Sequence, residues 1–171
     1  TNTTTTFTPL STTPGTYYYY VDVRNGATGG AIGCNTTASN VATITIHPLP
    51  VSTSTFASEN ICVGTAATSM TASATTATGT IATYQWYRNS SNSYTDATQI
   101  VSETNATFTP PTSTTGTTYY FCEITNSWGC STRTAISGAI NVYAAPVITS
   151  QPSGATYCQN VNATALSVTA T

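Results

Sequence analysis

Residues 82–88 read ATYQWYR, and residues 117–125 read TTYYFCEIT. In the first stretch Tyr84 and Trp86 alternate with Gln85 and Tyr87, which is the period of a β-strand with two different faces. The second stretch is rich in β-branched and aromatic residues, which fit a pleated and half-buried surface. The two stretches predict the long strands of an all-β protein.

Shorter strands are predicted around these two, each bounded by turn residues. Their expected ranges are 51–56, 66–75, 99–101, 106–109 and 135–142. No segment has a helical period, and turns recur at intervals of about 8–12 residues, as in antiparallel sandwiches. The expected fold class is therefore an all-β antiparallel sandwich.

The chain repeats itself at the length of one small domain. Cys34 and Cys130 are 96 positions apart, and so are Cys62 and Cys158. We therefore expect the last strands of one module in residues 1–47, a complete module in 48–144, and the first strands of another in 145–171. The sequence has the character of a piece of a longer tandem array. A rarer alternative is that the open ends of neighbouring copies complete each other, as in donor-strand assembly.

Composition excludes several classes of protein. Only 5% of residues are charged and the net charge is −2, which argues against nucleic-acid binding because that needs a basic surface. Eleven Tyr and two Trp supply enough apolar surface to argue against disorder. No stretch is long and apolar enough to span a bilayer. Five Cys in a Thr-rich, charge-poor chain favour an oxidising, extracellular or cell-surface location.

Several short motifs carry a resemblance to a known family. Trp86 lies in YQWY, Tyr120 lies two residues before Cys122, and Tyr19 lies two residues before Val21, as in the tyrosine corner of immunoglobulin-like sandwiches. With ICVG at 61–64 and TNSWGC at 125–130, the chain resembles the tandem immunoglobulin-like and PKD-like repeats of very large Bacteroidota surface proteins. The resemblance implies tandem immunoglobulin-like antiparallel β-sandwich modules with Trp86, Tyr120 and Tyr19 in their cores. It also implies an adhesin or another exported surface protein, of a kind often sent out by type IX secretion.

The cysteines depart from the antibody pattern. Cys62 lies 24 residues before Trp86, whereas that family's first core cysteine would fall at position 72 or 74 here. Because Val21 replaces Cys122 in the first copy, Cys122 is expected to be free and buried. The recurring cysteines are of two types: the ICVG type, Cys62 and Cys158, and the type that follows Gly in a GC pair, Cys34 and Cys130. A disulfide between a cysteine of one type and a cysteine of the other is favoured. It would either close one module, as Cys62–Cys130, or join adjacent modules, and Cys62–Cys122 remains an alternative.

No catalytic or metal site is expected, and no cofactor. The only histidine, His47, stands at a module edge where the second copy has Tyr143, which favours a structural role. The five acidic residues form no calcium loop and no catalytic pair, and the Cys spacings lack the pairs of a zinc site. Asp22 and Glu123 hold equivalent positions and are expected to be solvated. The chain is therefore not expected to be an enzyme.

Surface features suggest contacts rather than chemistry. Trp128, at the tip of the NSWG turn, is the best candidate for a contact residue, and the first copy has Ala27 there. The outward tyrosines of the run at 17–20 are expected to pair across strands, with sugar stacking as the less favoured alternative. Possible glycosylation sites, of which several arise by chance, are Asn2, Asn35, Asn89, Asn105 and Asn162.

These observations favour a structural or adhesive array in a surface protein, stalk or fibre. The expected partners are neighbouring modules of the same chain or identical chains in a fibre, with surface glycans as a further possibility. The alternative is a carbohydrate-binding accessory region of a secreted polysaccharide-degrading enzyme.

Overall fold

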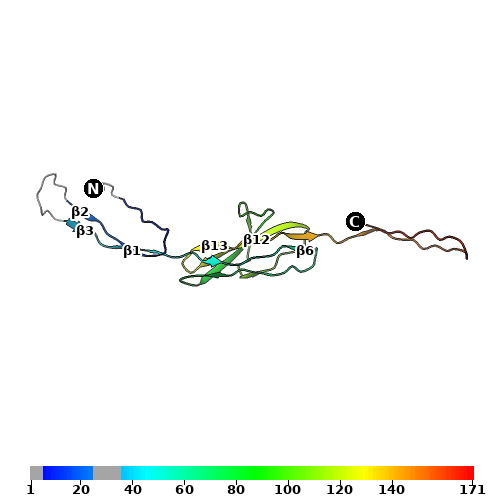
Figure 1. Ribbon diagram of the computed structural model, residues 1–171, viewed down its shortest axis with the longest axis horizontal. Coiled ribbons are helices and arrows are strands. Elements are labelled where there is room, and N and C mark those ends of the chain that lie inside the picture. The colour runs from blue at the N-terminus through cyan, green and yellow to red at the C-terminus, as the bar shows by residue number, and fades with distance from the viewer. Residues whose placement is uncertain (1–5, 25–35) are drawn as a thin grey trace.

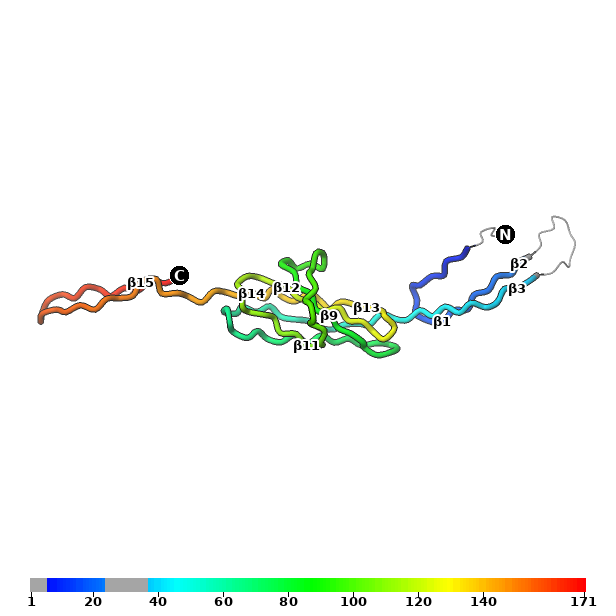
Figure 2. The backbone as a smooth tube through the Cα atoms, turned by 180° about the vertical axis from the view of Figure 1, so that it is seen from behind, coloured from blue at the N-terminus to red at the C-terminus, as the bar shows by residue number. Residues whose placement is uncertain are grey.

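The computed structural model describes residues 6–24 and 36–171. Within these residues the chain forms sixteen strands and no helix, so the predicted all-β class is confirmed. A central module lies between two thinner pieces, which extend from it in opposite directions (Figures 1 and 2). The described residues include no helix that would be able to cross a membrane.

The central module contains one large sheet. Its strand order is β10 (Thr98–Gln99), β9 (Ile81–Asn89), β12 (Gly116–Asn126), β14 (Ile140–Tyr143) and β6 (Glu59–Cys62), and β13 (Ser131–Arg133) also pairs with β12. β9 and β12 are antiparallel, with Trp86 opposite Cys122. β14 and β6 are parallel, with Val142 opposite Ile61. The two longest strands are those that the sequence predicts.

Two short strand pairs form the other layer of the module. β5 (Val51–Ser52) pairs with β8 (Ala74–Thr75), and β7 (Met70–Thr71) pairs with β11 (Thr107–Phe108). Both pairs are antiparallel. The core lies between this layer and the large sheet, an arrangement compatible with a β-sandwich.

Trp86 lies at the centre of the core and is 0% exposed. Its ring centroid lies 5.2 Å from that of Phe108 and 5.5 Å from that of Phe56. The indole Nε1 donates a hydrogen bond to the Asn105 carbonyl oxygen at 2.9 Å, so the one polar atom of this side chain is satisfied. The buried residues clustered with it include Ile61, Met70, Ala72, Tyr120, Cys122, Ile124 and Ile140.

The outer face of β12 is also covered, which the sequence did not predict. Phe121 is buried although it points away from the core that surrounds Trp86. Tyr87 stacks on its ring at 5.1 Å, and Tyr94 meets it edge-on at 4.9 Å. Tyr94 belongs to the polar loop between β9 and β10, so this loop folds back as a cover.

The two terminal pieces repeat the pairing found in the module. β1 (Gly15–Tyr19) pairs with β4 (Ala42–Ile46), and Gly15 stands opposite Ile46 just as Gly116 stands opposite Val142. β15 (Ile148–Ser150) pairs with β16 (Thr169–Ala170), and Ile148 stands opposite Ala170 just as Ser52 stands opposite Ala74. β2 (Asp22–Arg24) pairs with β3 (Thr36–Ala38).

Candidate functional site

The linker before the central module is held by a stacked ring pair and two hydrogen bonds from the module. The linker at 47–50 follows β4, and the turn after β12 packs against it. The rings of His47 and Trp128 stack with centroids 4.0 Å apart and planes 5° apart. The Asn126 Nδ2 donates to the Pro48 carbonyl oxygen at 3.2 Å, and the Cys130 thiol donates to the His47 carbonyl oxygen at 3.9 Å. Three side chains of one turn therefore hold the linker.

Asn126 also fixes the shape of that turn. Its Oδ1 accepts hydrogen bonds from the backbone N–H groups of Trp128 and Cys130, each at 3.0 Å. An Asn side chain that bonds to its own backbone two residues later is a common way to build such a turn. Asn126 is buried, so loss of these bonds would leave amide groups unpaired. Sequence reasoning missed this residue, although the Asn of TNSWGC is a turn signal.

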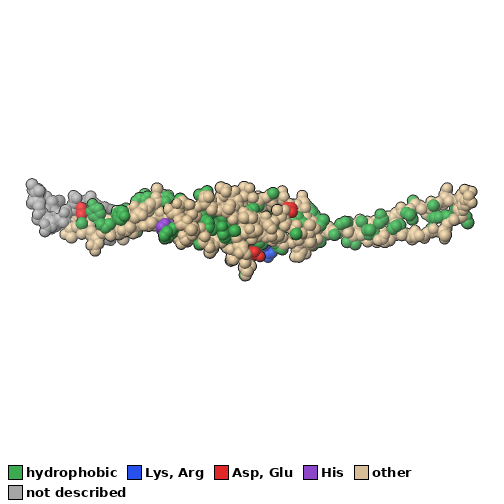
Figure 3. Space-filling model, turned by 90° about the horizontal axis from the view of Figure 1, so that it is seen from below, with side chains coloured by type: hydrophobic (Ala, Val, Ile, Leu, Met, Phe, Trp, Pro, Cys, Tyr) green, Lys and Arg blue, Asp and Glu red, His purple; other side chains and the backbone are tan. Residues whose placement is uncertain are grey.

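A groove of about 510 Å³ lies beside the stacked rings. Its lining is largely apolar and comprises residues from the first piece, the linker and the module, among them Pro14, Ile46, Ala77 and Trp128. Figure 3 shows the single histidine, in purple, next to apolar side chains on one face of the molecule. Trp128 remains 53% exposed in spite of its contact with His47. The candidate contact residue therefore lies at the junction, and one face of its ring is already occupied.

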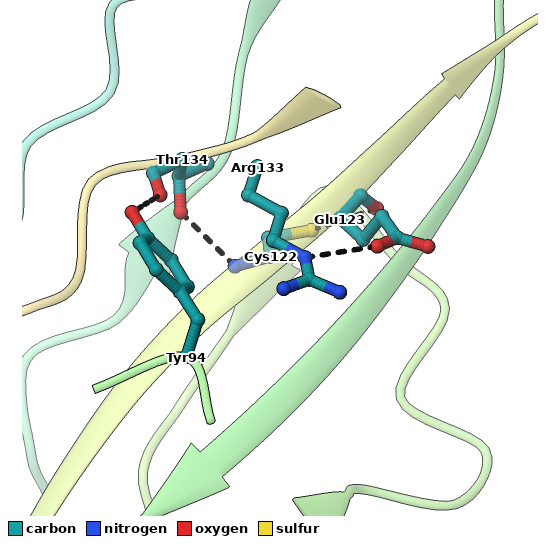
Figure 4. A network of polar contacts seen from close by, with 5 residues as sticks. All are labelled: Tyr94, Cys122, Glu123, Arg133 and Thr134. Atoms are coloured by element: carbon teal, nitrogen blue, oxygen red, sulfur yellow. Dashed lines mark hydrogen bonds and ion pairs between the residues drawn. The ribbon is translucent and has the colours of Figure 1, made fainter. Parts of the chain in front are cut away.

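A second polar network lies around β12 and β13 (Figure 4). The Cys122 backbone N–H donates to Thr134 Oγ1 at 3.0 Å, and the Tyr94 hydroxyl donates to the Thr134 carbonyl oxygen at 2.9 Å. The Arg133 Nε donates to Glu123 Oε2 at 3.0 Å, so Glu123, which the sequence places on an outward face, is partly exposed and also forms an ion pair. This network ties the covering loop to the sheet.

Cys122 is completely buried and unbridged. Burial, which would strip the thiolate of its hydration, raises the pKa of the thiol to about 11; a backbone hydrogen bond at Gln85 opposes this shift and the nearby Glu123 charge adds to it. The reactive thiolate form is therefore disfavoured at neutral pH. Cys122 acts as a small apolar side chain opposite Trp86.

The structure contains no disulfide among its described cysteines, and of the two arrangements left open by the sequence it lacks the bridge within one module. Cys62, Cys122, Cys130 and Cys158 are all free, and Cys34 lies outside the described residues. Cys62 stands opposite Tyr143, at the end of the sheet where β12 begins, whereas Cys130 follows the other end of β12. At about 3.3 Å per residue, the length of β12 separates the two thiols by far more than the Cα distance of about 7 Å that a disulfide tolerates.

The alternative pair, Cys62 and Cys122, is also too far apart. Cys122 stands in the middle of β12, opposite Trp86, while Cys62 lies at the edge strand β6 beyond the start of β12. Both within-module bridges are therefore incompatible with the strand register. A link between adjacent modules is the option that this geometry leaves open.

The remaining residues singled out in the sequence fall into different environments. Tyr120 is buried, and burial raises the pKa of its phenol. Tyr19 is half-buried and its ring lies 5.4 Å from that of Phe7. Asn89 uses its Nδ2, the atom to which a glycan would be attached, to donate to the carbonyl oxygens of Ser93 and Thr95 at 2.8 Å. Asn105 and Asn162 are exposed, while Asn2 and Asn35 lie outside the described residues.

The described residues contain no group of three or more His, Cys, Asp or Glu side chains that would be able to hold a metal ion. Comparisons of the chain with models of protein families, with curated proteins and with solved structures find no match.

Proposed function

We propose that this chain is a non-catalytic structural or adhesive region of an extracellular surface protein, stalk or fibre. In this proposal its units are tandem immunoglobulin-like sandwiches. The support is the two-layer arrangement around Trp86, the spacing of Tyr120 and Cys122 on β12, and the recurrence of the same pairing in the terminal pieces.

The observation that carries the proposal is the clamped junction. His47 and Pro48 are held by a stacked ring and two hydrogen bonds, all from the turn at 126–130. A linker held in this way cannot bend freely, so the piece before it is fixed relative to the module. Fixed junctions give an array reach and stiffness, which a stalk or a fibre needs.

Small-angle X-ray scattering of the full chain tests this proposal. At a concentration where it is monomeric, the wild-type protein is expected to scatter as a single elongated particle. Trp128→Ala should broaden the distribution of particle lengths, because the stacking on His47 is lost, while Trp128→Phe should retain much of the wild-type profile. A wild-type profile typical of freely jointed parts, unchanged by either substitution, would contradict the proposal.

The groove beside Trp128 supports a second candidate function, that of a carbohydrate-binding accessory module of a secreted polysaccharide-degrading enzyme. An exposed indole at the edge of an apolar groove of about 510 Å³ offers a surface on which a sugar ring can stack. A glycan array with the full chain, and with Trp128→Ala as the matched control, distinguishes the two functions. Binding that depends on Trp128 favours this second function, and the absence of binding favours the first.

A further inference from the structure

The two terminal pieces expose apolar side chains whose counterparts are buried. We call residues 6–24 and 36–47 the strand layer, and residues 147–171 the terminal hairpin. In the strand layer the exposed apolar residues include Phe7, Val21, Val23 and Ile44. In the terminal hairpin they include Tyr157, Leu166 and Val168. Clustered exposed apolar side chains of this kind are typical of protein–protein or ligand-binding surfaces.

The central module shows what covers such faces. Phe108 stands opposite Met70, and they are 4% and 6% exposed; the corresponding Phe7 and Leu166 are 68% and 75% exposed. Residues 51–75 of the module correspond to the terminal hairpin, and residues 107–142 correspond to the strand layer. The module therefore contains, within one chain, an interface between one surface of each kind; the strand that carries Trp86, which also packs on Phe108, has no counterpart in either piece.

We propose that the terminal hairpin of one copy of this chain binds the strand layer of a second copy in the register of the central module. By this correspondence Leu166 of the first copy stands opposite Phe7 of the second, as Met70 stands opposite Phe108. Residues 155–158 of the first copy form a strand that pairs in parallel with β4 of the second copy, as β6 pairs with β14. This register places Tyr157 opposite Ile46 and Cys158 opposite His47. Backbone pairing of this kind is β-strand addition, here between identical chains.

The shape of the hairpin supports this docking. Its two strands enclose an opening of about 360 Å³, lined by residues that include Pro152, Ala155 and Leu166. The matching opening in the module, about 390 Å³, has the corresponding lining, and Ile140 of β14 also lines it. The counterpart of Ile140 in the strand layer is Ile44, which is exposed and would line the opening of the hairpin in the docked pair. The hairpin has no charged residue, so no charge is buried when it docks.

The register also brings two thiols together. Cys158 of the first copy stands opposite His47 of the second, and in each copy the Cys130 thiol contacts the His47 carbonyl oxygen at 3.9 Å. Cys158 is exposed and Cys130 is partly exposed, so both are accessible. With oxidised glutathione as the oxidant, the two thiols lose two protons and two electrons, one S–S bond forms, and one oxidised glutathione becomes two reduced ones. The docked pair is therefore expected to acquire a Cys158–Cys130 link between copies.

This inference rests on the proposed function, since it treats both pieces as parts of modules, and it adds the identity of the partner. Sedimentation velocity over a wide range of protein concentration tests the docking, with reducing agent present. We expect head-to-tail oligomers that grow with concentration. Leu166→Asp should abolish them, because it puts a charge opposite Phe7. Val101→Asp is the matched control: Val101 is equally exposed but lies outside both surfaces, so its variant should associate like the wild type.

Oxidation in a glutathione buffer, followed by non-reducing electrophoresis and peptide mapping, tests the register. The expected product is a ladder of oligomers in which Cys130–Cys158 is the main link between copies. A monomer at every concentration, or links distributed at random among the exposed thiols, would overturn the inference. Because the stiffness of the junction is measured separately by scattering, a monomer with a fixed junction would leave the proposed function intact.

Discussion

The strand layer and the central module contain nearly the same aromatic contact in two different settings. The ring centroids of Phe7 and Tyr19 lie 5.4 Å apart with planes at 47°, and those of Phe108 and Tyr120 lie 5.2 Å apart at 49°. Yet Phe7 is mostly exposed and Phe108 is buried. The local sequence thus determines strand pairing and ring contact, whereas burial depends on the hairpin at 51–75 and on the strand that carries Trp86.

Truncating the two phenylalanines should give the largest difference between the regions. Phe108→Ala removes a ring packed on Trp86 and Tyr120, and we expect it to lower the free energy of unfolding by about 3–5 kcal/mol. Phe7→Ala should cost less than about 0.5 kcal/mol, because little of its surface is buried. Urea unfolding of the full chain, at a concentration where it is monomeric, measures both. Equal costs would show that the two settings do not differ as described.

The junctions on the two sides of the module form a second contrast, which Asn126→Ala should sharpen. The linker at 47–50 is held by Asn126, whereas Tyr143 at the end of β14 and Val147 after the module are exposed. Loss of the side chain leaves the partly buried backbone N–H groups of Trp128 and Cys130 without their acceptor, and we expect a cost of about 2–3 kcal/mol in urea unfolding.

Asn126→Asp is the comparison variant for that experiment: it keeps an acceptor oxygen, but it replaces the donor to Pro48 with an oxygen and adds a charge at a buried position. It should also lower the free energy of unfolding, and part of that loss should be recovered at low pH, where the carboxyl group is protonated and becomes a donor. A neutral result for Asn126→Ala would mean that water replaces these bonds and that the turn is not held by Asn126.

Cys122 and Val21, which occupy equivalent positions, allow a test by pH. The folded pKa of the Cys122 thiol is raised from 9.0 to about 11, so the folded state keeps a proton that the unfolded state loses. Its contribution is fully present below pH 9 and is lost as the pH rises through 11, by about 3 kcal/mol in all. Unfolding measured between pH 8 and 11 should show this loss relative to Cys122→Val, the substitution that copies the first module. Parallel pH profiles for the two proteins would contradict the burial of the thiol.

The ion pair on the outer face should have the smallest effect. Arg133 and Glu123 are both partly exposed, at 46% and 28% of their side-chain surface, so the pair is screened by solvent. Glu123→Gln should change the free energy of unfolding by less than about 0.5 kcal/mol, and added salt should reduce even this difference. A larger cost would indicate that Glu123 positions Arg133 over the Phe121 ring, where the guanidinium carbon lies 5.5 Å from the centroid.

Local patterns predicted the long strands β9 and β12 and the all-β class, because alternation and β-branched residues act over a few neighbours. They did not predict β6, whose sequence ENIC has little alternation and whose partner β14 lies far along the chain. The cover over Phe121 was missed for the same reason, since Tyr94 belongs to a polar loop. The separation of Cys62 from Cys130 and the stacking of Trp128 on His47 were not predicted either. Both depend on where the ends of strands lie in space, which local sequence patterns do not determine.

The parallel pairing of β6 with β14 has a mechanical consequence. One strand lies near the start of the module and the other at its end, and they are joined by bonds such as those from the Glu59 N–H to Ala139 and from the Val63 N–H to Tyr143. Tension between the two ends of the module would pull these strands past each other lengthwise, so all bonds of the ladder share the load and must yield together. A hairpin peeled from one end gives way one bond at a time under the same tension. The module is therefore built to resist stretching along the direction in which Figure 1 shows the molecule to extend.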